Sequence, residues 1–108
     1  MLNFFEEQIR RCEEQEKQRI AEDRRDEANL QKIRGNIFRV FKSVYERSLK
    51  EAQPEVFFRK RLETIPQNWQ EAYEKAKVQE DAAGLLIEQT KLEAAADIRK
   101  TLDKEGFA

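Results

Sequence analysis

The chain has 108 residues, of which 40% are charged, and its formal net charge is −1. That length allows one domain, and the small net charge together with ten aromatic residues argues against a disordered chain. A single cysteine excludes an internal disulfide framework. The absence of histidine removes the usual general base, the Ser-His and Cys-His nucleophile systems and most zinc sites. We therefore expect no enzyme activity and no bound cofactor or metal.

The composition predicts an all-α protein. Glu, Lys, Arg, Gln and Ala are abundant, whereas the chain contains only three glycines and two prolines, as is typical of long helices and coiled coils. No sustained alternation of apolar and polar residues indicates a strand, and no Asn-Gly or Asp-Gly pair indicates a hairpin turn. We expect one elongated helical domain over residues 1–108.

The first element is a long helix predicted over residues 3–52, because no proline interrupts this part of the chain. Asn3 followed by Glu6 has the spacing of a capping box at its start. Gly35 lies inside the helix, where it costs about 1 kcal/mol relative to alanine and can mark a kink. A broad apolar stripe runs along the second half of this helix at steps of three and four residues, with Lys32, Arg39, Lys42 and Lys50 on the opposite side. The stripe comprises Leu30, Ile33, Ile37, Val40, Phe41, Val44, Ser48 and Ala52, widened by Phe38, Tyr45 and Leu49.

Residues 13–27 differ from the rest of this helix, because charged side chains occupy the positions where an apolar stripe would continue. Ion pairs at helical spacing each contribute about 0.2–0.5 kcal/mol, which supports a helix without attaching it to anything. The expected pairs include Glu6–Arg10, Glu7–Arg11 and Glu13–Lys17. A straight helix of about 50 residues is about 75 Å long, so it must overhang the core or bend back at Gly35. Its apolar tip then needs cover, either from the last helix of the same chain or from a second copy.

Two further helices are predicted after the first. Pro54 marks the start of a short helix over residues 54–63, since proline is favoured at the first helical position. Residues 64–68 form the next turn, and Asn68 with Glu71 repeats the capping-box spacing. The last helix is expected over residues 68–104 with Gly106 placed to end it, and it bends or changes partner near Gly84.

These elements predict a long–short–long arrangement in which the two long helices are antiparallel. The short helix closes one end of this helical hairpin, which resembles a coiled coil or a small helical bundle. The hydrophobic centre is expected to contain Ile33, Ile37, Val40, Phe41, Val44, Phe57, Leu62, Trp69 and Tyr73.

Few residues offer reactive chemistry. A metal site built only from carboxylates is conceivable at Glu13, Glu14 and Glu16, but these side chains face several directions on a helix. Cys12 shares the stripe of Phe5 and Ile9, so we expect an apolar filler rather than a reactive thiol.

The charges are unevenly distributed along the chain. Residues 31–64 carry a net charge of +5, whereas residues 1–30 and 65–108 carry −3 each. The basic middle can pair with the acidic ends of the same or a neighbouring chain, or it can bind an anionic lipid surface or nucleic acid, although nucleic-acid binders are usually basic overall. The candidate basic patch comprises Lys32, Arg39, Lys42, Arg59, Lys60 and Arg61.

The function predicted from the sequence is that of a small non-enzymatic interaction or scaffold protein. We expect it to self-associate through its long helices as a homodimer or larger assembly, or to bind another helical protein. The candidate partner interface comprises Leu2, Phe5, Ile9, Ile20, Leu92 and Leu102. The alternative is a nucleic-acid-associated or regulatory protein that uses the basic segment 32–61.

Two features bear on location. The longest apolar run, residues 82–87, is far shorter than the roughly 20 residues that cross a bilayer, so we expect no membrane span. The first residues lack the basic flank and apolar run of a signal peptide, which makes the cytoplasm the expected location.

Overall fold

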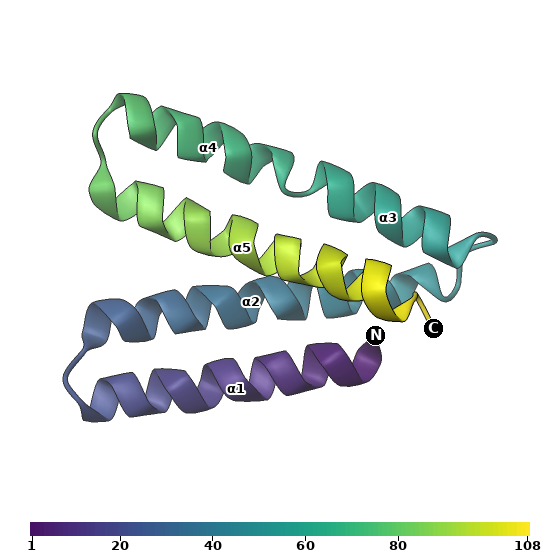
Figure 1. Ribbon diagram of the computed structural model, residues 1–108, viewed down its shortest axis with the longest axis horizontal. Helices are drawn as coiled ribbons and strands as arrows, with labels where there is room; N and C mark the ends of the chain where they lie inside the picture. The colour runs from purple at the N-terminus through teal and green to yellow at the C-terminus, as the bar shows by residue number, and fades with distance from the viewer.

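The computed structural model describes all 108 residues, and it contains five α-helices and no strand (Figure 1). This confirms the all-helical prediction. The predicted long–short–long arrangement is not confirmed, because each of the two long helices is interrupted by a turn that the sequence did not reveal. The helices are α1 (Leu2–Ala21), α2 (Arg25–Ser48), α3 (Pro54–Thr64), α4 (Gln67–Val78) and α5 (Ala82–Glu105).

The first unexpected turn separates α1 from α2, so the prediction of one helix over residues 3–52 is wrong. Asp23 adopts a left-handed conformation with φ of 58°. The Asp23 N–H donates to the Ile20 carbonyl at 3.0 Å, and the Arg24 N–H donates to the Arg19 carbonyl at 2.7 Å. This is the hydrogen-bond pattern of a Schellman motif, which ends a helix and is usually built with glycine at the left-handed position. The chain therefore bends back beyond Ala21 and not at Gly35.

The second unexpected turn has the same construction, and it divides the predicted helix over residues 68–104. Glu80 has φ of 55°. Its N–H donates to the Lys77 carbonyl at 3.3 Å, and the next N–H, of Asp81, donates to the Ala76 carbonyl at 2.9 Å. Asp81 then caps α5, because its carboxylate accepts a hydrogen bond from the Gly84 N–H at 3.0 Å. Gly84 thus lies in the first turn of α5, where a Cβ at this position would overlap the Asp81 carboxylate.

The remaining helix ends match the sequence prediction in part. Pro54 begins α3, and Gly106, with φ of 85°, ends α5 as expected. Both predicted capping boxes are wrong, because α1 begins before Asn3 and α4 begins before Asn68, and neither helix has a side-chain cap. A capping residue lies just outside the helix, whereas Asn3 and Asn68 already lie inside α1 and α4.

Helices α3 and α4 lie nearly end to end (Figure 1). Ile65 and Pro66, which join them, keep right-handed helical angles. The Ile65 N–H still donates to the Arg61 carbonyl at 2.9 Å, and the Gln70 N–H donates to the Pro66 carbonyl at 2.9 Å. Since proline has no N–H and its ring crowds the preceding turn, the connection is a proline-broken helix and not a reversal of the chain.

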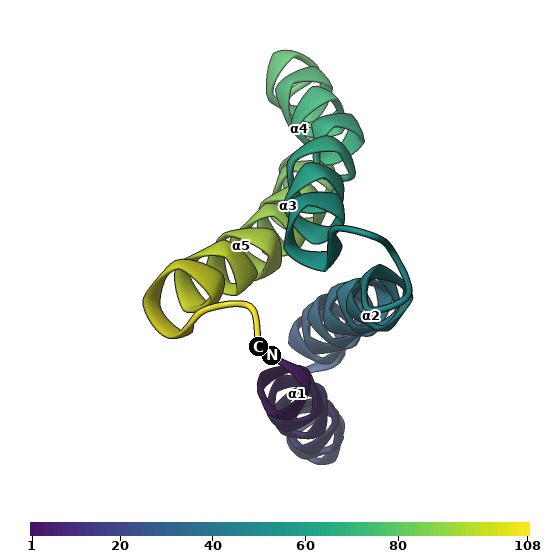
Figure 2. The same cartoon turned by 90° about the vertical axis from the view of Figure 1, so that its right-hand side faces the viewer.

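The chain therefore forms two helical hairpins, α1–α2 and α4–α5, joined through α3. Helix α2 packs against α1, α3 and α5, while α4 packs against α5. In Figure 2, α1 and α4 lie at opposite sides of the molecule with α2 and α5 between them. The radius of gyration is 14.9 Å, larger than the roughly 13 Å expected of a compact chain of this length, so the molecule is elongated.

The core is centred on aromatic rings from α1, α2 and α3. The Phe58 ring packs edge-to-face against Tyr45, Phe41 and Phe5, with centroid separations of 5.8, 6.5 and 6.3 Å. Phe5 is fully buried, so the chain itself covers this part of its apolar start, although Leu2 is exposed. The buried cluster comprises Phe5, Cys12, Ile37, Phe38, Phe41, Tyr45, Phe58, Leu62, Ala94, Ala95, Ile98 and Leu102.

The predicted hydrophobic centre is partly correct. Ile37, Phe41 and Leu62 are buried, and Val44 and Trp69 are half-buried against the cluster. The other half-buried members of the predicted set are Ile33, Phe57 and Tyr73. Val40 is 43% exposed and its inclusion was wrong, because α2 turns the side of Phe38 and Tyr45 toward the core.

Gly35 serves close packing of α1 against α2. It is buried in the middle of α2, and a Cβ built there would lie 3.2 Å from the Cβ of Cys12. That separation is tighter than ordinary van der Waals contact, so a larger side chain would push the two helices apart. Gly35 therefore marks a helix contact and not a kink.

Replacing Gly35 by valine is expected to lower the free energy of unfolding by about 1–3 kcal/mol, because the added methyl groups overpack the α1–α2 contact. Urea unfolding followed by circular dichroism measures this change. Lys32→Val is the matched control, since it places the same β-branched residue on an exposed position of α2. Equal losses in both variants would contradict the role assigned to Gly35.

Replacing Glu80 by glycine is expected to stabilise the fold by about 0.5–1 kcal/mol, because glycine removes the cost of a left-handed L residue but adds freedom to the unfolded chain. Glu80→Ala keeps the left-handed strain and should give no such gain. Thermal and urea unfolding of the two variants beside the natural chain would test this. A gain of the same size in the alanine variant would show that loss of the carboxylate, and not the backbone angle, is responsible.

Candidate interaction surfaces

Four ion pairs join different helices, and all follow one rule. Each pairs a basic side chain from the basic middle segment with an acidic side chain from one of the two acidic segments that flank it. The pairs are Arg39–Glu13 at 2.6 Å, Lys42–Glu6 at 3.8 Å, Arg34–Asp97 at 2.5 Å and Arg59–Asp103 at 3.0 Å. Four of the nine basic residues of the middle segment therefore find acidic partners from the flanking segments within one chain.

This arrangement changes the expected pairing along α1. Glu6 and Glu13 face Lys42 and Arg39 of α2, so the predicted pairs Glu6–Arg10 and Glu13–Lys17 are absent. A pair between two packed helices holds one helix against the other, whereas a pair within one helix only supports that helix. Because these side chains remain about half exposed, each pair contributes at most about 1 kcal/mol.

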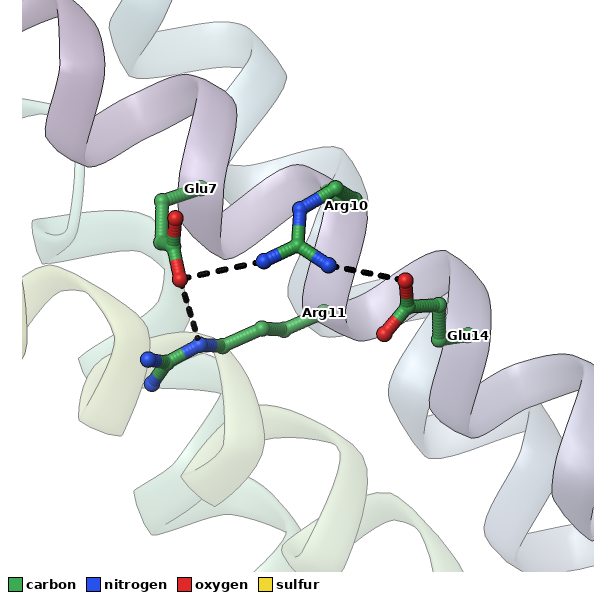
Figure 3. A network of polar contacts seen from close by, with 4 residues as sticks. All are labelled: Glu7, Arg10, Arg11 and Glu14. Carbon is green, nitrogen blue, oxygen red and sulfur yellow. Dashed lines mark hydrogen bonds and ion pairs between the residues drawn. The ribbon is translucent and has the colours of Figure 1, made fainter.

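The predicted pair Glu7–Arg11 is present, within a network on the exposed face of α1 (Figure 3). Glu7 accepts hydrogen bonds from Arg10 at 3.1 Å and from Arg11 at 3.0 Å, and Arg10 also donates to Glu14 at 2.8 Å. The hydrogen bond and charge of Glu14, followed by the charge of Glu7, raise the pKa of Arg10. The network supports α1 and leaves no unpaired cation for a partner at this point.

The six predicted basic-patch residues do not form one surface. Arg39, Lys42 and Arg59 pair with carboxylates on neighbouring helices, while the Arg61 guanidinium lies over the Phe57 ring at 5.1 Å. Hydrogen bonds from Arg59, first to Glu55 and then to Asp103, raise the pKa of Arg59. The exposed residues Lys32 and Lys60 have no ion pair.

The six residues of the predicted partner interface also lie in different places, some in the core and some at the surface. Phe5 and Leu102 lie in the core, which corrects their assignment as contact residues for a partner. Ile9 is half-buried against the core, and Leu92 is half-buried at a cavity of about 290 Å³ between the α3–α4 junction and α5. Leu2 and Ile20 are exposed, at 40% and 51%. No single face contains all six residues.

A pocket of about 370 Å³ lies between the second half of α2 and α3. Its floor is apolar, and its remaining side chains are two guanidinium groups and one hydroxyl. The lining residues are Ser43, Val44, Arg47, Phe57, Arg61 and Ile65. Sequence reasoning singled out Arg61 but missed Arg47. The four-residue spacing of Phe57 and Arg61 on α3 and Ile65 at its C-cap is the signal that could have drawn attention to this face.

The second surface lies at the end of the α4–α5 hairpin. Val78 is 83% exposed and Leu86 is 49% exposed, while Leu85 and Ile87 are half-buried but lie outside the core cluster. Sequence reasoning missed this surface because it expected Val78 in the middle of a continuous helix.

Other chemistry is limited. Cys12 is 4% exposed, and burial raises the pKa of its thiol. No group of three or more Cys, Asp or Glu side chains is arranged to hold a metal ion, and Glu13, Glu14 and Glu16 form no such cluster. No helix combines the length and the apolar character that crossing a membrane requires.

Comparison with known proteins yields no relative. No protein-family model matches the chain, and neither the curated proteins nor the solved structures contain a significant match.

The Cys12 thiol is expected to react with a water-soluble disulfide reagent only as fast as the chain opens, because burial hinders access and disfavours the reactive thiolate. Absorbance at neutral pH follows the reaction, which should accelerate in urea. A Lys17→Cys chain that also carries Cys12→Ala has an exposed thiol on the same helix and should react rapidly without denaturant. Rapid reaction of Cys12 in the natural chain would contradict the packing of α1 on α2.

Proposed function

We propose that this chain is a small non-enzymatic interaction protein that self-associates through its helices. The observation that supports it is the apolar end of the α4–α5 hairpin. Val78 and Leu86 remain largely in water there, although burying a side chain of this kind gains about 1.5–3 kcal/mol. Isolated exposed apolar residues are common, but here two lie at one hairpin end beside the half-buried Leu85 and Ile87.

The position of this surface differs from the one expected for self-association. Phe5 of α1 is used within the chain, since it packs against Tyr45 and Phe58, while Leu2 and Ile20 of the same helix are exposed. The end of the α4–α5 hairpin lies on the opposite side of the molecule from α1, where no other helix covers it (Figure 2). A second helical chain can cover it by laying a helix against the apolar face.

The alternative of nucleic-acid binding has less support. Three of the six basic side chains on which it rests already have carboxylate partners on other helices. Lys32, Lys60 and Arg61 remain available, which is few for binding that depends on neutralising many phosphates.

Light scattering coupled to size exclusion over a tenfold concentration range tests the proposal. We expect a mass above the 12.9 kDa of one chain that rises with concentration. The Val78→Lys/Leu86→Lys variant should return to the single-chain mass, because two cations replace the apolar contact. Ile20→Lys is the matched control, since Ile20 has similar exposure at the end of the other hairpin. A natural chain that stays at 12.9 kDa throughout would overturn the proposal.

A further inference from the structure

The two hairpins repeat one another at a constant spacing along the chain. Helix α2 occupies Arg25–Ser48 and α5 occupies Ala82–Glu105, so α5 begins and ends 57 residues after α2. The left-handed turn residues Asp23 and Glu80 are separated by the same 57 residues. On this shift α1 corresponds to residues 59–78, which lie along the line of α3 and α4. One spacing therefore relates residues 2–48 to residues 59–105.

The buried side chains follow the same shift. All four buried residues of α5 correspond to buried residues of α2. The pairs are Ile37 with Ala94, Phe38 with Ala95, Phe41 with Ile98 and Tyr45 with Leu102. In the outer helices Phe5 corresponds to Leu62, and both are almost completely buried. Two hairpins that shared only the helical period would not have to share the position of the turn and of the buried face as well.

Charged side chains keep their sign at several corresponding positions, although few residues are identical. Glu6 and Glu63 correspond, as do Glu14 and Glu71, and these are the only identities in the two segments. Towards the ends of α2 and α5 the corresponding residues differ in type but not in sign. They are Lys42 with Arg99, Glu46 with Asp103 and Arg47 with Lys104. The repetition is therefore one of structure and pattern more than of residue identity.

The hairpins are arranged as a twofold pair. Helices α2 and α5 run in the same direction, and both hairpin turns lie at one end of the molecule (Figure 1). Seen along the helices, α1 and α4 lie outside α2 and α5 on opposite sides (Figure 2). A half-turn about an axis parallel to the helices thus exchanges the two hairpins. The rings of Phe38 and Phe41 on α2 share one buried cluster with the small Ala94 and Ala95 on α5, so corresponding residues are complementary in size.

We propose that residues 2–48 and 59–105 are two copies of one hairpin unit, and that the α2–α5 contact is the interface through which these units pair. The partner that fits the buried face of α2 is then another hairpin of the same kind, which this chain supplies itself. The second copy differs where Pro66 takes the place of Ile9, which breaks the outer helix beside a cavity of about 290 Å³. The interface lies within one chain, so this inference goes beyond the association between chains proposed above and does not depend on it.

Distances between pairs of spin labels test the twofold relation. The labels are attached to cysteines that replace Lys17, Lys32, Glu74 or Gln89, which are exposed, in chains that also carry Cys12→Ala. Lys17 and Lys32 of the first unit correspond to Glu74 and Gln89 of the second. The Lys17–Lys32 and Glu74–Gln89 distances should agree within the width of the measured distributions. The crossed distances, Lys17–Gln89 and Lys32–Glu74, should agree as well, because a twofold axis exchanges them.

Either disagreement overturns the proposal. Unequal distances within the hairpins would show that they are not copies of one unit. Unequal crossed distances would show similar hairpins that are stacked without a twofold axis, since stacking in the order α1, α2, α4, α5 places α4 much closer to α2 than α1 is to α5. Labelled chains are mixed with an excess of unlabelled chain, which removes distances between different copies and makes the result independent of self-association. Cys12→Ser replaces Cys12→Ala if the alanine variant loses helix content by circular dichroism.

Discussion

The burial of Phe58 is the interaction on which the rest of the structure depends. This residue belongs to the short helix α3, yet its ring contacts Phe5 of α1, Tyr45 of α2 and Phe107 of the C-terminal tail. Aromatic rings bury large areas and favour edge-to-face packing, so one residue can hold several elements in place. The Tyr45 hydroxyl adds a hydrogen bond to the Phe107 carbonyl at 3.2 Å, which fixes the end of the chain beside its start. A thin core is thereby concentrated at one end of the molecule.

Ion pairs between the helices accompany the packing around that core. The basic segment lies mostly on α2 and α3, and both acidic segments are packed against it. Arg39 pairs with α1, Arg34 with α5, and Arg59 with the last turns of α5. Each partly exposed pair is weak, so these contacts add little to stability. The sequence distribution of charge, which first suggested a binding surface for nucleic acid, is explained in part by ion pairs within one chain.

The sequence allowed the helix content and several helix ends to be predicted, but not the number of helices. Pro54 and Gly106 lie where their backbone preferences place them, and both ends were predicted from them. The two hairpin turns escaped prediction because Asp23 and Glu80 occupy left-handed positions that glycine usually takes. Conversely, the interior glycines suggested bends where there are none. Gly35 permits close contact with Cys12, and Gly84 accommodates the Asp81 cap. Here tertiary packing, and not local preference, decides where the chain turns.

The candidate surfaces follow from that missed turn. Once the chain reverses at Glu80, Val78 becomes the last residue of α4 instead of the middle of a long helix. Helix α4 packs mainly on α5, so Ala76 in its last turns is buried while Val78 stays exposed. The α2–α3 pocket stays open for a related reason, because the proline-broken junction carries α4 onward in line with α3 instead of folding it back over α2. The turn at Glu80 therefore exposes Val78, whereas the junction at Pro66 leaves the α2–α3 pocket open.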